Sequence, residues 1–268
     1  MMRLLFFSTA HAWPFPTVLA LFLSGALSLL SSFSPSNLQA RSSDPEAKAL
    51  FDRSFKKGDV EAARDLRRAV SIEPGYTDAH FRLGFLYQKM NFREEAAAEY
   101  KTTIAQEPCH TKALINLGNL MSDAHRSNEA IGLYKKAIHC SPDFYAGYYN
   151  LAIVEPSRRQ SLLEKALQKN PDHFGSLFLL AQTLRSVHPD RALAYLDRAC
   201  AVKEEPRCLQ DLGQWYAEEG LPSKARKAWK RALYLSKHPV QRQEIRRMLQ
   251  NLDRPSASKP SRDQQPPA

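Results

Sequence analysis

The sequence predicts an all-α protein built as a solenoid of antiparallel helix pairs. Its 268 residues include only 10 Gly, and Ala, Leu, Arg and Lys are abundant, which favours helices and argues against an all-β sandwich or a Gly-rich phosphate loop. With 43% apolar and 25% charged residues, the chain is not disordered throughout. Pro74, Pro108 and Pro142 are evenly spaced, and their period of about 34 residues predicts a repeat architecture.

Residues 1–40 are expected to direct export. They carry one formal charge, at Arg3, ahead of an apolar stretch from Thr17 to Phe33. This order is typical of a secretory signal peptide, with cleavage expected after Ala40. The alternative is an uncleaved membrane anchor, although a run of about 17 residues is short for a bilayer of roughly 30 Å.

Small and large apolar residues recur with the same period between the prolines. Leu83-Gly84 and Leu117-Gly118 lie one period apart, and a small residue at this place lets two antiparallel helices approach closely. Proline then ends the second helix of each unit. The recurring sets ahead of the prolines are Ala62, Leu66 and Ala69; Ala96, Tyr100 and Thr103; and Ala130, Tyr134 and Ala137.

The pattern continues in altered form towards both ends. The fourth unit is five residues shorter around Pro156, the fifth is one residue short, and the sixth has full length. The first unit has Leu50 in place of the usual glycine motif, as expected of a terminal repeat. The sequence thus predicts about six units within residues 41–238: 44–74, 77–108, 111–142, 145–171, 174–205 and 206–238.

These residues resemble the tetratricopeptide repeat family over residues 44–238, about three quarters of the chain. The resemblance implies a right-handed superhelix of helix pairs, concave on the side lined by the first helix of each unit. It also implies that ligands bind in this concave groove.

A capping helix and a tail are expected after the last unit. Residues 239–252 place Ile245, Met248, Leu249 and Leu252 on one face, which suits a helix that seals the exposed core of the final repeat. Residues 253–268 are rich in Pro and Ser, with a basic balance and no hydrophobic period, and are expected to be disordered.

The net charge of +10 is concentrated at the C-terminal end. Residues 41–223 are balanced, whereas residues 224–268 hold 12 basic and 3 acidic side chains. This end, with Arg242, Arg246 and Arg247 as its expected basic surface, suits anionic lipid headgroups or an acidic envelope polymer. The alternative is a solvated helix face, and nucleic acid is not expected because the chain is predicted to be exported.

The four cysteines form two expected pairs. Cys109 begins the first helix of the third unit and Cys140 ends its second helix, and antiparallel helices bring these positions to one rim. Cys200 ends the second helix of the fifth unit, and Cys208 opens the first helix of the sixth. An even number of cysteines in an exported chain favours disulfides, with free thiols as an alternative. The second junction also resembles that of cysteine-stapled secreted helical-repeat proteins, which implies a bridge between neighbouring units.

A metal site is a further alternative at the first pair. Cys109-His110 and His139-Cys140 would bring two thiols and two imidazoles to one rim, and these are ligands that suit zinc or copper. Consecutive residues point in different directions and the usual two-residue spacers are missing, so no metal or cofactor is expected. No special role is expected for the other histidines: His80, His125, His173, His188 and His238.

The family resemblance implies a set of groove residues. Ligands of such repeats usually contact the second, fifth, sixth, ninth and twelfth residues of each unit. In this sequence these positions give the candidate binding residues Phe81, Phe85, Gln88, Lys112, Ile115, Asn116, Asn119, Tyr149, Asn150, Ile153, Phe178 and Gln182.

Two asparagines of this set, Asn116 and Asn150, lie one period apart. They are expected to form hydrogen bonds with the backbone of an extended peptide, while the aromatic members of the set supply apolar pockets. The two-lysine clamp for terminal carboxylates is incomplete, since Lys112 has no matching lysine at the neighbouring fifth positions. The alternative is that these residues only pack and cover the solenoid.

No motif of a known catalytic class occurs in the sequence. It lacks a phosphate loop, a Gly-x-Ser-x-Gly elbow and a His-Glu-x-x-His pair, so we do not expect an enzyme. The leading hypothesis is an exported scaffold that binds a protein or peptide, in envelope assembly or secretion. The alternatives are a membrane-surface adaptor that uses the basic C-terminal helices and a metal-binding accessory protein.

Overall fold

The computed structural model describes residues 44–253, which form thirteen α-helices and one short 3-10 helix, with no strand among the described residues. The segments expected to be a leader (1–40) and a tail (253–268) lie outside this range, except that Asp253 is the last residue of the final helix. The helices are α1 (Pro45–Ser54), α2 (Asp59–Ile72), α3 (Thr77–Lys89), α4 (Arg93–Gln106), α5 (Thr111–Asp123), α6 (Ser127–Cys140), α7 (Tyr145–Val154), α8 (Arg159–Lys169), α9 (Phe174–Leu184), α10 (Pro189–Val202), α11 (Pro206–Glu218), α12 (Pro222–Leu235) and α13 (Pro239–Asp253).

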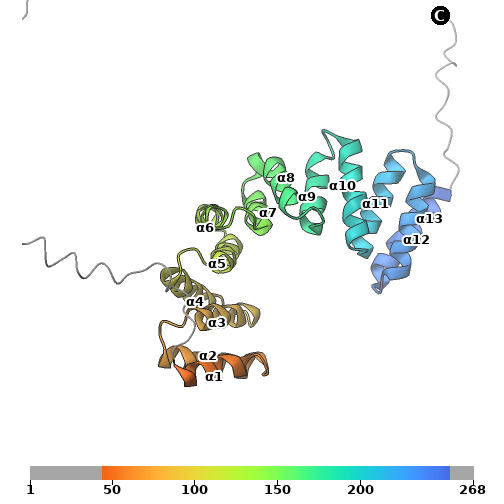
Figure 1. Cartoon of the computed structure of the whole chain (residues 1–268). Coiled ribbons are helices and arrows are strands. Elements are labelled where there is room, and N and C mark those ends of the chain that lie inside the picture. The colour runs from red at the N-terminus through yellow and green to blue at the C-terminus, as the bar shows by residue number, and fades with distance from the viewer. Residues whose placement is uncertain (1–43, 254–268) are drawn as a thin grey trace, which may run out of the picture. The chain divides into compact units, whose positions relative to one another are not determined.

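Consecutive helices pack as pairs, and each pair packs on the next (Figure 1). The pairs are α1–α2, α3–α4, α5–α6, α7–α8, α9–α10 and α11–α12, and α13 packs on α12. The fourth pair is shorter than the others, because α7 has only 10 residues and is joined to α8 through the 3-10 helix Pro156–Arg158. Within residues 44–253, no helix is long and apolar enough to cross a membrane.

Close packing within a pair depends on a glycine in the first helix and a large ring in the second. Gly84, Gly118 and Gly213 face the rings of Tyr100, Tyr134 and Trp229, respectively, and all three rings are buried. The absence of a β-carbon lets the ring lie directly on the backbone of the first helix. The recurring small residue therefore sets the spacing of the two helices, as the sequence pattern predicts.

In three of the six pairs, α3–α4, α5–α6 and α11–α12, the turn between the helices is a helix C-cap with left-handed backbone. Asn91, His125 and Gly220 have φ values of 65°, 58° and 70°. In each turn the next residue donates its N–H to a carbonyl five residues earlier, at 2.8 Å in all three cases. This is the Schellman arrangement, which glycine and asparagine adopt most easily.

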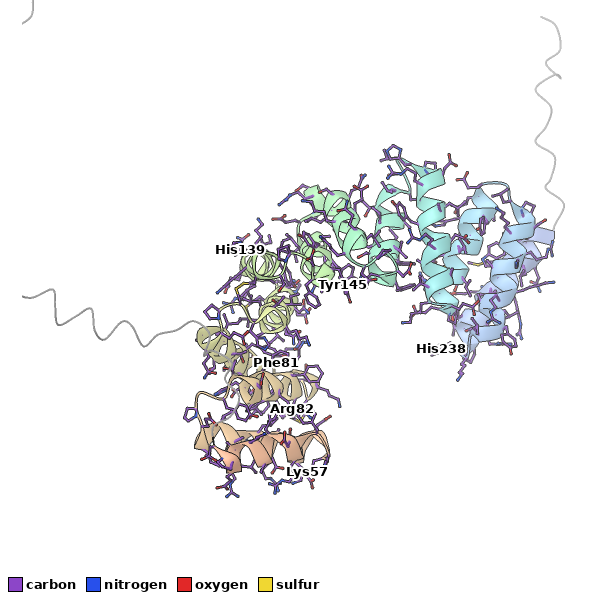
Figure 2. The ribbon with its side chains drawn as sticks, in the orientation of Figure 1. Lys57, Phe81, Arg82, His139, Tyr145 and His238 are labelled. Carbon is purple, nitrogen blue, oxygen red and sulfur yellow. A yellow bond between two sulfur atoms is a disulfide. The ribbon has the colours of Figure 1, made fainter. Side chains whose placement is uncertain are left out.

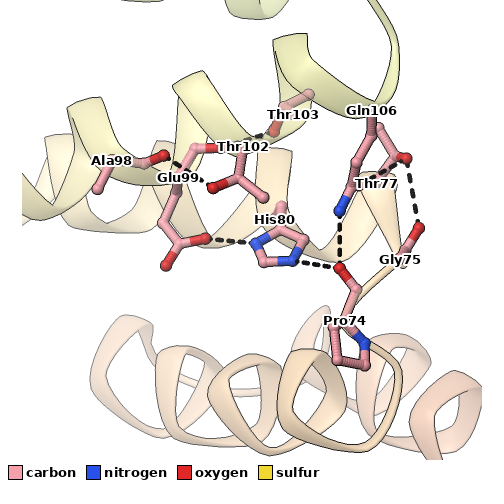
Figure 3. A network of polar contacts seen from close by, with 9 residues as sticks. All are labelled: Pro74, Gly75, Thr77, His80, Ala98, Glu99, Thr102, Thr103 and Gln106. Atoms are coloured by element: carbon pink, nitrogen blue, oxygen red, sulfur yellow. Dashed lines mark hydrogen bonds and ion pairs between the residues drawn. The ribbon is translucent and has the colours of Figure 1, made fainter.

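A partly buried polar network joins the second pair to the end of the first unit (Figure 3). The His80 ring nitrogens lie 2.6 Å from Glu99 Oε2 and 3.0 Å from the Pro74 carbonyl oxygen. Gln106 Nε2 donates to the same carbonyl at 2.7 Å. His80 therefore has a structural role in fixing the junction, which its place in the sequence does not indicate.

Candidate functional site

A cleft of about 570 Å³ opens where α3, α5 and α7 lie side by side. Its walls come from the first helices of the second, third and fourth pairs and from the residues that precede α7 and α9. The side chains that line it are Phe81, Phe85, Lys112, Ile115, Asn116, Asn119, Phe144, Tyr145, Ala146, Tyr149, Asn150 and His173. Figure 2 marks Phe81 and Tyr145 on the inner side of these helices.

The cleft gathers eight of the twelve candidate residues from three different helices. They are Phe81, Phe85, Lys112, Ile115, Asn116, Asn119, Tyr149 and Asn150. Phe85 is 48% exposed, whereas Ile115 is only 6% exposed and forms part of the floor. The structure thus brings the second, fifth, sixth and ninth positions of neighbouring units together on one surface.

The other four candidate residues lie outside this cleft. Gln88 is at the twelfth position and uses its Oε1 to accept a hydrogen bond from the Tyr100 hydroxyl at 2.8 Å. Phe178 stacks on Phe174 with ring centroids 5.7 Å apart and packs against the core. Ile153 and Gln182 are exposed at the ninth positions of α7 and α9, beyond the end of the cleft.

Four lining residues were absent from the sequence prediction: Phe144, Tyr145, Ala146 and His173. Phe144 and His173 are the residues that precede α7 and α9, and Tyr76 and His110 hold the same place before α3 and α5. A ring thus recurs ahead of four first helices, and the first three of these rings lie one repeat period apart. The period that relates Pro74, Pro108 and Pro142 therefore also relates the first three of these rings, and it is the sequence signal that indicates them.

Two of these rings cap the helix that follows and pack on the first helix of the preceding pair. His110 Nδ1 accepts the N–H of Ala113 at 3.1 Å, and its ring lies 4.5 Å from that of Phe81. His173 Nδ1 accepts the N–H of Ser176 at 3.2 Å. A ring nitrogen can accept only when it carries no proton, so each of these caps requires an unprotonated Nδ1.

His173 is enclosed by aromatic side chains of α7. Its ring centroid lies 4.5 Å from that of Tyr145 and 4.8 Å from that of Tyr149. Burial lowers the pKa of His173 below its ordinary value, because the charged imidazolium loses hydration there. This wall of the cleft is therefore uncharged near neutral pH.

Hydrogen bonds from the second helices orient the polar floor. The buried Tyr100 hydroxyl accepts from Asn116 Nδ2 at 3.2 Å, and the Tyr134 hydroxyl donates to Asn119 Oδ1 at 2.8 Å. Burial raises the pKa of both tyrosines to about 12, so both remain protonated. The side chain of Asn150 makes no hydrogen bond with a described residue, which leaves its amide group available to a ligand.

The cleft has a single cationic side chain among its lining residues. Lys112 is exposed and forms no ion pair with any described residue, and no carboxylate lines the cleft. The surface is therefore apolar and aromatic at its sides, with amides and one ammonium group between them. Such a combination can bind an extended chain through apolar side chains and backbone hydrogen bonds.

Both cysteine pairs are disulfides in the structure. Cys109 is bonded to Cys140, and Cys200 to Cys208, with Cα–Cα distances of 5.4 and 5.6 Å. The first closes the α5–α6 pair beside the cleft, and the second joins α10 to α11.

With its two sulfur atoms bonded to each other, the Cys109–Cys140 rim has no thiolate to offer a metal. The neighbouring His110 already uses Nδ1 as a helix cap. Within residues 44–253, no group of three or more His, Cys, Asp or Glu side chains is placed to hold a metal ion.

The expected basic surface of α13 divides into two parts. Arg246 and Arg247 are exposed. Arg242 instead donates from Nη1 to the carbonyl oxygens of Leu233 and Ser236, at 2.6 and 2.9 Å. It thereby satisfies the C-terminal end of α12, so its guanidinium group serves the packing of the capping helix.

Comparison with solved structures identifies the fold. PilF of Pseudomonas aeruginosa is similar, with a TM-score of 0.65, 21% identity, and coverage of 76% of this chain and 97% of the other. PilW, described as a widely conserved type IV pilus biogenesis factor, gives a TM-score of 0.63 and 15% identity, and the match covers 76% of this chain and 99% of PilW. YrrB, described as a TPR protein with an unusual peptide-binding site, gives 0.51 and 17% identity, over 69% of this chain and 99% of YrrB.

No family model and no curated protein matches the sequence. The structural similarities and the helix pairs show that the chain has the tetratricopeptide-repeat fold. The predicted all-α fold is confirmed.

Proposed function

We propose that this protein is an exported, non-catalytic scaffold that holds an extended segment of a partner protein in the cleft between α3, α5 and α7. The observation that carries the proposal is the composition of the cleft. Aromatic side chains, of which Phe85 is 48% exposed, line the cleft together with Asn150, whose side chain has no hydrogen-bond partner among the described residues, and no acidic group lines the surface. Phe85 and Tyr149 would bind apolar side chains of the segment, while Asn150 would form hydrogen bonds with its backbone.

Two features support the exported location. Disulfides persist mainly in oxidising compartments, and this chain holds two of them in its repeats. Residues 1–40 have the order of a signal peptide, or alternatively of an anchor that stays in the membrane. Two of the similar structures are PilF and a type IV pilus biogenesis factor, and we propose a role in envelope assembly or secretion for this chain as well.

A selection from a phage-displayed library of random peptides, with the full chain as bait, tests the proposal. Selected peptides would then be measured by fluorescence anisotropy against the chain and against a Phe85→Ala/Asn150→Ala double variant. Both side chains lie at the cleft surface rather than in the core, so the variant should fold. We expect it to weaken binding about tenfold or more, because it removes an aromatic anchor and a backbone hydrogen bond.

The matched control is Phe92→Ala/Asn128→Ala. Phe92 is 50% exposed, close to the value for Phe85, and Asn128 is exposed on α6, but neither residue lines this cleft. Peptides that bind the wild type and both double variants with equal affinity would place recognition elsewhere and refute the proposed groove.

A further inference from the structure

Among the described helices, α12 carries the largest net positive charge. This helix carries five basic and no acidic side chains, whereas α2, α4, α6, α8 and α10, which hold the same place in their pairs, each carry at least one Asp or Glu. The basic composition of α12 does not come from altered packing, because its core-facing residues Ala225, Trp229 and Ala232 are buried as in the other second helices.

The cations of α12 lie together on its solvent-facing side. Lys224, Lys227, Lys230 and Arg231 are all exposed, and residues three and four apart share one face of a helix. Tyr234, one further turn along, is on the same face and is 78% exposed. Its ring centroid lies 5.5 Å from the Arg231 guanidinium carbon.

Most of this charge is not neutralised within residues 44–253. Arg231 pairs with Glu204, but Lys224, Lys227 and Lys230 form no ion pair with a described residue. Some cations in the second helices of other pairs are instead neutralised by an acid at the neighbouring unit, as in Arg198 with Asp172. Lys224 and Lys227 border a hollow that Asp197 and Glu204 also line, without an ion pair to either, and Lys230 is exposed to solvent.

An exposed tyrosine beside lysines is a combination that suits a bilayer surface. Tyrosine is enriched at membrane–water interfaces because its ring lies among the headgroups while its hydroxyl stays hydrated. Lysines near an anionic leaflet each strengthen attachment about fivefold. Val240, in the first turn of α13, is a further exposed apolar side chain, at 70% exposure.

We propose that the outer face of α12, defined by Lys224, Lys227, Lys230 and Tyr234, binds the anionic phospholipid headgroups of a membrane surface. The aromatic ring favours a lipid bilayer over a soluble acidic polymer, which offers charge but no apolar layer. This site is separate from the cleft between α3, α5 and α7 and does not depend on peptide binding there. It would hold the repeats at a membrane and leave the cleft free for a partner.

The test is co-sedimentation of the full chain with vesicles of phosphatidylcholine alone or with about 30% phosphatidylglycerol. We expect the anionic vesicles to bind at least tenfold more strongly at low salt, and the difference to shrink as salt rises from about 0.05 to 0.5 M. In Lys224→Glu/Lys227→Glu/Lys230→Glu, the anionic preference should fall at least tenfold, because three attractive charges become repulsive. Tyr234→Ala should weaken binding severalfold, with no change in the salt dependence.

The control variant is Lys48→Glu/Lys101→Glu/Lys136→Glu, which makes the same change in net charge at exposed positions of other helices. It should bind the anionic vesicles within a fewfold of the wild type. An equal loss in both triple variants would show that only overall charge matters and would overturn the proposal. Equal binding of the wild type to both vesicle types would also overturn it, as would binding to dextran sulfate without binding to anionic vesicles.

Discussion

Replacing Gly118 by alanine should destabilise the fold, although alanine is the better helix former. A β-carbon built at Gly118 lies 2.5 Å from Cε1 of Tyr134 and 3.0 Å from its Cδ1. The ring cannot easily move aside, because it is 2% exposed and its hydroxyl donates to Asn119 at 2.8 Å. The α5–α6 pair must therefore separate locally, or the hydrogen bond must break.

The size of the effect follows from three contributions. Overpacking in a close-packed core costs about 1–3 kcal/mol, and loss of the Tyr134–Asn119 hydrogen bond adds about 1 kcal/mol. The helix propensity of alanine returns about 1 kcal/mol. We expect a net loss of about 2 kcal/mol in the free energy of unfolding, and weaker peptide binding as well, because Asn119 lines the cleft.

Gly132→Ala is the matched control, in the partner helix α6. Nothing lies within 4 Å of a β-carbon built there, so this variant should gain about 0.5–1 kcal/mol from helix propensity alone. Urea unfolding followed by far-UV circular dichroism, with the disulfides intact, compares the two variants with the wild type. If Gly118→Ala were stabilised as much as Gly132→Ala, close ring-on-backbone packing would not set the helix spacing.

Three further predictions concern a turn and two titrating groups. His125→Gly should stabilise the protein by about 0.5–1 kcal/mol in the same urea assay, because glycine adopts the left-handed φ of 58° without strain; a loss of stability would contradict this. Arg53 and Lys57 hold the pKa of the buried Asp65 at about 2, below its ordinary 3.8, so about 2 kcal/mol of stability should be present above pH 4 and lost as pH falls from 4 to 2. Asp65→Asn should lack this acid-dependent part of the unfolding free energy, and an unchanged pH profile would count against the ion pairs. Burial lowers the pKa of His173 below 6.5, so its helix cap should be intact above pH 6.5 and weaken as pH falls through the lowered pKa. His173→Asn keeps a neutral cap and should flatten the pH dependence of peptide affinity between pH 8 and 5. If peptide affinity changed equally with pH in the wild type and in the variant, His173 would not be the source of the pH dependence.

The helix pairs could be predicted because their packing repeats at a fixed spacing in the sequence. Gly84 and Gly118 lie one period apart, and in both places the structure puts a tyrosine ring on the glycine. Each unit is a local element that contacts mainly its neighbours. The sequence pattern of one unit therefore predicts most of the contacts of that unit, because few of them join residues that are far apart in the chain.

The polar contacts between units could not be predicted in the same way. His80 contacts Glu99 of the next helix and the Pro74 carbonyl, and neither contact repeats in the other units. Arg242 looks like a free surface cation in the sequence, but its guanidinium group reaches the last carbonyls of α12. Such contacts depend on the rotamer of one long side chain, which the repeat period does not encode.

The cleft is preorganised in the absence of a ligand, and this limits the new interactions that a ligand can form there. Asn116 and Asn119 are already held by the hydroxyl groups of Tyr100 and Tyr134, and the Cys109–Cys140 disulfide fixes the start of α5, which carries both asparagines. A bound segment would therefore cost little reorganisation of the protein, and most of the entropic cost would fall on the peptide itself. The main attractive contributions left are the exposed aromatic rings, the amide of Asn150 and the charge of Lys112. It follows that a partner segment which is preordered as an extended strand should bind more tightly than a flexible one of the same composition.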